Sequence, residues 1–136
     1  MRILDDSTRT AAEAAAALDV AVANIAKTLV FLADDAPVVV VAGGASRVDT
    51  DRLAGEIGAA EVRKADADAV RAATGYPIGG VSPVGLPEGL VVVVDGALAP
   101  LDPIWAAAGH PRAVYRTTFD ELLAVSGGRV VDVAER

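Results

Sequence analysis

A lysine interrupts one of the most apolar stretches of the chain, NIAKTLVFLAD at residues 24–34. If this stretch is a strand, its side chains alternate between two faces, and Lys27 shares a face with Ile25, Leu29 and Phe31. An ammonium group among apolar side chains must be paired, hydrogen-bonded or neutralised. Lys27 is therefore a candidate site residue, because burial makes a single charge count heavily. The alternative is a structural lysine whose stem packs on apolar surface while its ammonium reaches water.

A loop rich in glycine and proline, TGYPIGGVSPVGLPEG at residues 74–89, is the second candidate. Its five glycines allow backbone N–H groups to approach a ligand closely, and its three prolines fix the shape of the loop before anything binds. Preorganised backbone donors suit ester or acyl chemistry. A structural loop that merely reverses the chain is an equally good interpretation of these residues alone.

Other residues carry weaker signals. His110 stands between Gly109 and Pro111, a loop position suited to a polar contact with a substrate, although a lone surface histidine is the more common case. The segment VAGGAS at residues 41–46 lacks the spacing of known phosphate-binding loops, and we interpret it as a turn. Ser82 has no histidine and aspartate partners at a recognisable spacing, so a hydrolase triad is not supported.

Composition limits the class of protein. The chain has 136 residues, 53% of them hydrophobic, which predicts a single domain with one core of Val, Leu, Ile and Ala. With no cysteine and one histidine, the common zinc sites are excluded, and no calcium-loop spacing is present, so we expect no metal. The net charge of −7 argues against nonspecific coating of nucleic acid, but it is compatible with a locally basic mouth around one nucleic-acid end.

The same sequence predicts where the protein acts. Its apolar runs are too short to cross a bilayer, and no secretory signal is recognisable at the amino end. The absence of cysteine removes any disulfide framework. We therefore expect a soluble, cytoplasmic protein with no membrane partner.

The elements that must position these residues mix strands and helices without a regular βαβ order, which favours a mixed sheet over a doubly wound parallel one. Strands are predicted at residues 25–32, 38–42, 90–96, 102–109, 113–118 and 129–133, and the first two form a hairpin. Helices are predicted at residues 8–19, 50–57, 65–73 and 119–127, with caps near their ends. No regular structure is expected at residues 74–89.

Five segments follow one another along nearly the whole chain: AxxLDV…IAKTLVF, VVVVAGGASRVD, TGYPIGGVSPVG, VVVVDGAL and AAAGHPRAVYRTTFDEL. The most specific parts are the lysine in IAKTL and a Gly-x-x-x-Pro loop, here Gly79 to Pro83. In this combination and order the chain resembles the YbaK/EbsC family, the stand-alone relatives of the editing domain inserted in bacterial prolyl-tRNA synthetases. The resemblance favours the functional interpretation of both Lys27 and the loop.

The resemblance implies an α+β single domain with a mixed, mostly antiparallel and barrel-like sheet flanked by short helices. It also implies hydrolysis of a mischarged aminoacyl-tRNA, with the ester at the terminal adenosine lying between the lysine and the loop. It assigns catalysis to Lys27, Gly79 and Gly80, and substrate binding to Thr28, Val81, Ser82, Pro83, Asp95, Gly109 and His110. No metal or other cofactor is implied. The expected partners are the 3′ end of a mischarged tRNA and an aminoacyl-tRNA synthetase, and monomer and homodimer both remain open.

Two features differ from the family pattern. Members that act on cysteinyl-tRNA carry a serine shortly before a Gly-Gly pair, where this chain reads WAAAGH at residues 105–110, which argues against cysteine specificity. The additional N-terminal helix and strand of the family are not recognisable, so the expected editing domain spans residues 1–136. We expect a small aliphatic or hydroxylated amino acid as the substrate group. The alternatives are a noncatalytic module that binds a tRNA end, a nucleotide or a synthetase, and a hydrolase of small esters or amides.

Overall fold

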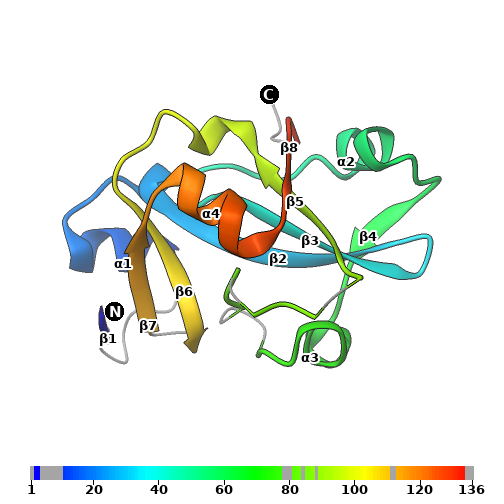
Figure 1. Ribbon diagram of the computed structural model, residues 1–136, viewed down its shortest axis with the longest axis horizontal. Coiled ribbons are helices and arrows are strands. Elements are labelled where there is room, and N and C mark those ends of the chain that lie inside the picture. Colours follow the sequence, from blue (N-terminus) through cyan, green and yellow to red (C-terminus); the bar gives the residue numbers. More distant parts are fainter. Residues whose placement is uncertain are drawn as a thin grey trace.

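The computed structural model describes residues 2–3, 11–77, 81–83, 85–87, 89–110 and 113–133 (Figure 1). Its strands are β1 (Arg2–Ile3), β2 (Ile25–Ala33), β3 (Ala36–Gly43), β4 (Val62–Lys64), β5 (Val91–Asp95), β6 (Ile104–His110), β7 (Ala113–Thr117) and β8 (Arg129–Val131). Its α-helices are α1 (Ala11–Leu18), α2 (Thr50–Ile57), α3 (Ala67–Thr74) and α4 (Phe119–Ser126), and two short 3₁₀ helices are η1 (Val22–Asn24) and η2 (Gly96–Leu98).

The two longest strands, β2 and β3, form the hairpin that the sequence predicts. Their antiparallel register leaves Asp34 and Asp35 to make the turn. Both aspartates have positive φ, 48° and 68°, as in the two-residue turns whose twist matches that of the flanking strands. The Asp34 carboxylate also accepts hydrogen bonds from the backbone N–H groups of Ala60 and Glu61, which lower its pKa and tie the turn to the segment before β4.

The helices α2, α3 and α4 begin at capping side chains and end at glycines in the left-handed conformation. The sequence predicts these ends except the start of α3, which lies two residues after the predicted Ala65. The N-caps are Asp49, Asp66 and Thr118, and the C-caps are Gly58, Gly75 and Gly127. Each N-cap oxygen accepts a hydrogen bond from the first turn of its helix, which satisfies backbone donors that have no partner within the helix. In the described part of the chain, no helix is long and apolar enough to cross a bilayer.

The strands form one mixed sheet in the order β1-β7-β6-β2-β3-β5-β8, and β4 also pairs with β2. Among the described pairings, β1–β7, β7–β6, β2–β3 and β2–β4 are antiparallel, whereas β6–β2, β3–β5 and β5–β8 are parallel. The predicted α+β class with a mixed, mostly antiparallel sheet is therefore confirmed. Strands β1 and β4 were not expected from the sequence, because two or three residues are too few to show an alternating pattern.

Helices cover both faces of the central strands (Figure 1). On one face, Val40 packs in a cluster with Leu53 of α2. On the opposite face, Val41 packs in a cluster with Leu122 of α4, and α3 covers the same face farther along β2 through Val70. Burial on both faces explains why β3 and β5 appear in the sequence as continuous runs of valine rather than as alternating patterns.

Candidate functional site at the open edge of strand β2

The edge of β2 that faces away from β3 is only partly paired. One strand pairs with each end of this edge, and a gap is left between the two strands. Strand β6 pairs with β2 up to Ala26, and β4 pairs with it from Phe31 onward, so within the described sheet no strand covers the residues between. The carbonyl of Val30 points toward this edge, where it accepts a hydrogen bond from Ala65 N–H at 3.2 Å. Because alternate residues of a strand present their peptide groups to the same edge, the N–H and C=O of Thr28 face this gap as well.

A cavity of about 150 Å³ lies at this gap. Its mostly apolar lining consists of Thr28, Leu29, Val30, Phe31, Lys64, Ala65, Val70 and Val81. Thr28 is 6% exposed, and its Oγ1 has no hydrogen-bond partner among the described residues. An unpaired buried hydroxyl costs about 1–3 kcal/mol. The Thr28 hydroxyl is therefore positioned to bind a polar atom of a ligand.

Lys27 lies on the face of β2 opposite to Thr28, because consecutive side chains alternate. It stands across from Ala42 of β3, and its Nζ donates a hydrogen bond to the carbonyl oxygen of Ser46 at 2.5 Å. Phe31 shares this face and packs in the core, as predicted, but Lys27 itself is partly exposed. The methylene groups of Lys27 therefore lie on an apolar face of β2, and its ammonium group is hydrogen-bonded to the loop after β3.

Two further cations lie within electrostatic reach of Lys27. Arg47 directly follows the residue that binds the ammonium, and Lys64 stands across from Phe31 at the rim of the cavity. Burial lowers the pKa of Lys27, and the charges of Lys64 and Arg47 lower that pKa further. This part of an otherwise acidic protein is locally basic.

The Gly/Pro loop contributes to the cavity from the other side. Val81 lines the cavity, and Ser82 and Pro83 are buried beside it. Gly79 and Gly80 lie outside the described residues. The structure thus brings Val81 together with Thr28 on one face of β2, whereas Lys27 reaches toward Ser46 on the opposite face.

Three other predicted residues do not line the cavity in the described part of the structure. Asp95 ends β5 and is 1% exposed; its Oδ1 accepts a hydrogen bond from Ala97 N–H at 3.2 Å and caps η2, while its Oδ2 has no partner among the described residues. Gly109 and His110 lie in the last part of β6, where His110 pairs with Ala113 of β7. The His110 side chain lies outside the described residues.

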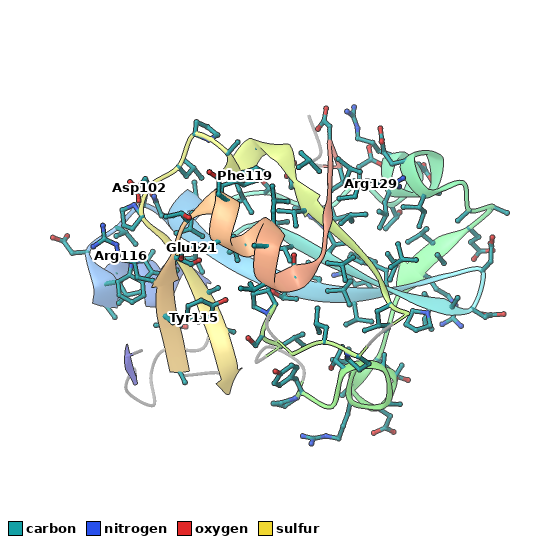
Figure 2. The ribbon with its side chains drawn as sticks, viewed as in Figure 1. Asp102, Tyr115, Arg116, Phe119, Glu121 and Arg129 are labelled. Carbon is teal, nitrogen blue, oxygen red and sulfur yellow. The ribbon has the colours of Figure 1, made fainter. Side chains whose placement is uncertain are left out.

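A polar cluster beside Ser82 escaped the sequence analysis. The hydroxyl of Tyr115 on β7 is buried without a hydrogen bond of normal geometry among the described residues. Burial, followed by the charge of Glu121, raises the pKa of Tyr115 to about 12, and the nearby Ser82 hydroxyl acts in the opposite direction. Figure 2 shows Tyr115 and Glu121 on the neighbouring elements β7 and α4. The Glu121 carboxylate also accepts a hydrogen bond from Thr117 at 3.0 Å.

The alternation in AVYRT was the available signal for this cluster, since it places Tyr115 on the same face as the buried Ala113 and Thr117. It did not reveal that Ser82, more than thirty positions away, lies beside the tyrosine.

The described residues include no group of three or more His, Cys, Asp or Glu side chains that are arranged to hold a metal ion. The cavity at the open edge of β2 offers backbone groups, the Thr28 hydroxyl and Lys64. Lys27 holds its ammonium at Ser46, on the opposite face of the strand.

Comparison with known proteins identifies the family to which the chain is similar. A family profile described as an aminoacyl-tRNA editing domain matches residues 5–125. A proline–tRNA ligase of Ligilactobacillus salivarius (strain UCC118) is 34% identical over 94 residues, which cover 69% of this chain and 16% of the ligase. The uncharacterized protein YwhH of Bacillus subtilis (strain 168) is 29% identical over 133 residues, which cover 96% of this chain and 84% of YwhH.

A solved structure shares the fold along nearly the whole chain. The crystal structure of a candidate trans-editing enzyme for prolyl tRNA synthetase superposes with a TM-score of 0.92 at 39% sequence identity, covering 99% of this chain and 85% of that one. By contrast, the chain corresponds to only 16% of the length of the matched Ligilactobacillus ligase. The similarity to the ligases therefore concerns one segment of those larger enzymes.

Proposed function

Because the chain belongs to the aminoacyl-tRNA editing domain family, we propose that it is an aminoacyl-tRNA deacylase that hydrolyses the ester of a mischarged tRNA in trans. Its substrate would be a tRNA that carries a small aliphatic or hydroxylated amino acid. The similarity to proline–tRNA ligases and to a candidate trans-editing enzyme for prolyl tRNA synthetase makes a proline tRNA the first substrate to test. The proposal places this reaction in the cytoplasm.

The observation that carries the proposal is the cavity at the open edge of β2. Thr28 presents its peptide N–H and C=O there, together with a hydroxyl that has no partner among the described residues. Val81 supplies the loop side of the lining, and Lys27 directly precedes Thr28 along the strand. A cavity of about 150 Å³ suits a small side chain better than a large one. This size supports a small amino acid as the substrate group.

The chemistry follows from what ester hydrolysis requires. A water molecule adds to the ester carbonyl, the carbonyl oxygen becomes an oxyanion, and collapse of this intermediate breaks the bond to the ribose oxygen, which takes up a proton. Hydrogen-bond donors and a positive charge near the carbonyl stabilise the oxyanion. In the proposal, the loop at Gly79 and Gly80 supplies backbone donors, Lys27 supplies the charge, and neither role calls for a metal ion.

The test is a panel of proline tRNAs charged with alanine, serine, threonine or cysteine, with each ester assayed for deacylation. We expect hydrolysis of at least one small amino acid above the uncatalysed rate, and poor activity on the cysteinyl ester. Absence of hydrolysis from the whole panel at high enzyme concentration would refute the deacylase. Binding without turnover would favour a noncatalytic module of the same fold.

Variants of Lys27 separate catalysis from folding. Lys27→Ala should abolish deacylation while the fold survives, because removal of a partly buried ammonium relieves desolvation and like-charge repulsion. Lys27→Arg should also fail, since a planar guanidinium cannot place its charge at the same point. Deacylation rate and thermal unfolding should be measured together for both variants. Near-normal turnover without the lysine would contradict the proposed role, and a large loss of stability would make the role structural.

A further inference from the structure

Tyr115 lies on the same face of the sheet as the cavity at Thr28. It stands across from Ala106 of β6, and Ala106 stands across from Ala26 of β2. Paired residues of neighbouring strands share a face, and Thr28 follows two positions after Ala26 on that face. Both alanines are buried, and because their side chains are small, the ring of Tyr115 packs against the cluster that contains them.

The Gly/Pro loop covers this face with residues that form no helix or strand. Val81 lines the cavity together with Thr28, and the next residue, Ser82, is 4% exposed. Neither residue belongs to a regular element, and Pro83, which follows them, has no backbone N–H to donate. Side-chain contacts must therefore help to fix the position of this part of the loop.

The hydroxyls of Tyr115 and Ser82 lie next to each other. Burial and the charge of Glu121 raise the pKa of Tyr115, whereas the Ser82 hydroxyl lowers it, as a hydrogen-bond donor to the phenolic oxygen does. This oxygen is buried and has no bond of normal geometry among the described residues. A phenylalanine would pack its ring equally well without a buried hydroxyl. Contact with the loop gives that hydroxyl a purpose.

We propose that Tyr115 is a positioning residue: its hydroxyl holds Ser82, and through Ser82 the Gly/Pro loop, at a fixed distance from Thr28. The inference rests on the proposed function, in which this loop supplies backbone donors to the oxyanion. A hydrogen bond at a reaction site is often long in the free protein and shortens when the substrate binds. The contact between Tyr115 and Ser82 then tightens as the ester enters, and it places the loop without touching the substrate.

The first test measures the loop itself, without substrate. Hydrogen–deuterium exchange is compared among wild type, Tyr115→Phe, Ser82→Ala and the control Thr117→Val. Thr117 lies two positions after Tyr115 on β7, but its hydroxyl donates to the Glu121 carboxylate at 3.0 Å rather than to the loop. Exchange in peptides that contain position 82 should rise about tenfold in Tyr115→Phe and Ser82→Ala, because both lose the same hydrogen bond. In the control these peptides should match wild type.

The second test measures deacylation of a mischarged proline tRNA that the wild type hydrolyses. Tyr115→Phe should lower kcat about tenfold and leave KM within about twofold, because the hydroxyl acts on the loop and not on the substrate. The double variant of Tyr115→Phe and Ser82→Ala should lose no more than the single variants, since the second change removes a partner that is already lost. Thr117→Val should keep the wild-type kcat.

Thermal unfolding of each variant separates positioning from a loss of stability. In Tyr115→Phe the ring keeps its packing against the cluster that contains Leu122, so Tm should change little at neutral pH. A fall in Tm that accounts for the loss of activity would make the role of Tyr115 structural and overturn the inference.

The outcomes also distinguish this inference from the proposed function. The inference is overturned if Tyr115→Phe leaves loop exchange unchanged, if it leaves kcat unchanged in an active protein, or if the two single effects add in the double variant. It is overturned as well if Thr117→Val changes loop exchange as much as Tyr115→Phe. If exchange at the loop rises in Tyr115→Phe and Ser82→Ala while wild type hydrolyses no ester, Tyr115 positions the loop and the deacylase fails.

Discussion

The buried hydroxyl of Thr28 leads to a prediction in which one chemical change has opposite effects at two sites. Thr28→Val replaces the hydroxyl by a methyl group of nearly the same size, at a site that is 6% exposed and where Oγ1 has no partner among the described residues. Removal of an unpaired buried hydroxyl relieves about 1–3 kcal/mol of desolvation cost. We therefore expect the free energy of unfolding to rise by about 1–2 kcal/mol, which for a chain of this length raises Tm by roughly 3–6 °C.

The matched control is Thr74→Val. Thr74 is also buried, but its Oγ1 donates to the carbonyl of Val70 at 2.7 Å and accepts from Tyr76 N–H at 3.1 Å. The same substitution there breaks two hydrogen bonds and should lower the free energy of unfolding by about 1–3 kcal/mol.

Urea and thermal unfolding of wild type and both variants measure these effects, and deacylation is assayed in parallel. Thr28→Val should be more stable and less active, as expected when a polar group is kept for binding at the expense of stability. If Thr28→Val loses as much stability as Thr74→Val, the Thr28 hydroxyl is hydrogen-bonded in the folded protein and the reasoning is refuted.

Two further predictions concern groups whose environment is unusual. The pKa of Tyr115 is raised to about 12 in the folded protein, whereas a tyrosine in the unfolded chain titrates near pH 10, so the free energy of unfolding falls as pH rises above 10. Tyr115→Phe should weaken this fall. Superimposable curves of Tm against pH for wild type and the variant would contradict the prediction. A Cβ added to Gly128 would lie 2.7 Å from Val94 Cγ2, so Gly128→Ala should lower the free energy of unfolding by about 1–3 kcal/mol. By contrast, a Cβ at Gly55 inside α2 meets nothing within 4 Å, so Gly55→Ala should raise the free energy of unfolding by about 1 kcal/mol. Chemical denaturation of both alanine variants checks the difference in sign, and equal effects would exclude the packing argument.

Residues close together in the chain allowed much of the fold to be predicted. The hairpin of β2 and β3 follows from alternation on both sides of a turn, and the boundaries of α2 and α4 follow from capping side chains and terminal glycines. These features depend on interactions within a few residues, so local sequence contains the information that determines them. The family resemblance likewise rested on motifs that are continuous in the sequence, and the profile match to residues 5–125 confirmed it.

The candidate site shows where local information ends. Lys27 and Thr28 were singled out from the sequence, yet alternation along β2 sends them to opposite faces, and the cavity is associated with Thr28. Strand β4 was missed, because three residues show no period, although it supplies Lys64 and one border of the gap.

The residues that meet at the gap come from distant segments. Lys64 approaches Lys27 because β4 pairs with the far end of β2, and Ser82 meets Tyr115 because the loop and β7 pack on the same side of the sheet. These contacts depend on strand order and on which edge of β2 is left uncovered. No local propensity encodes either property, because both result from packing the whole sheet against its helices. The sequence by itself determined the longer elements and the family, whereas the short strand β4, the cavity and the approach of Lys64 to Lys27 depend on the tertiary fold.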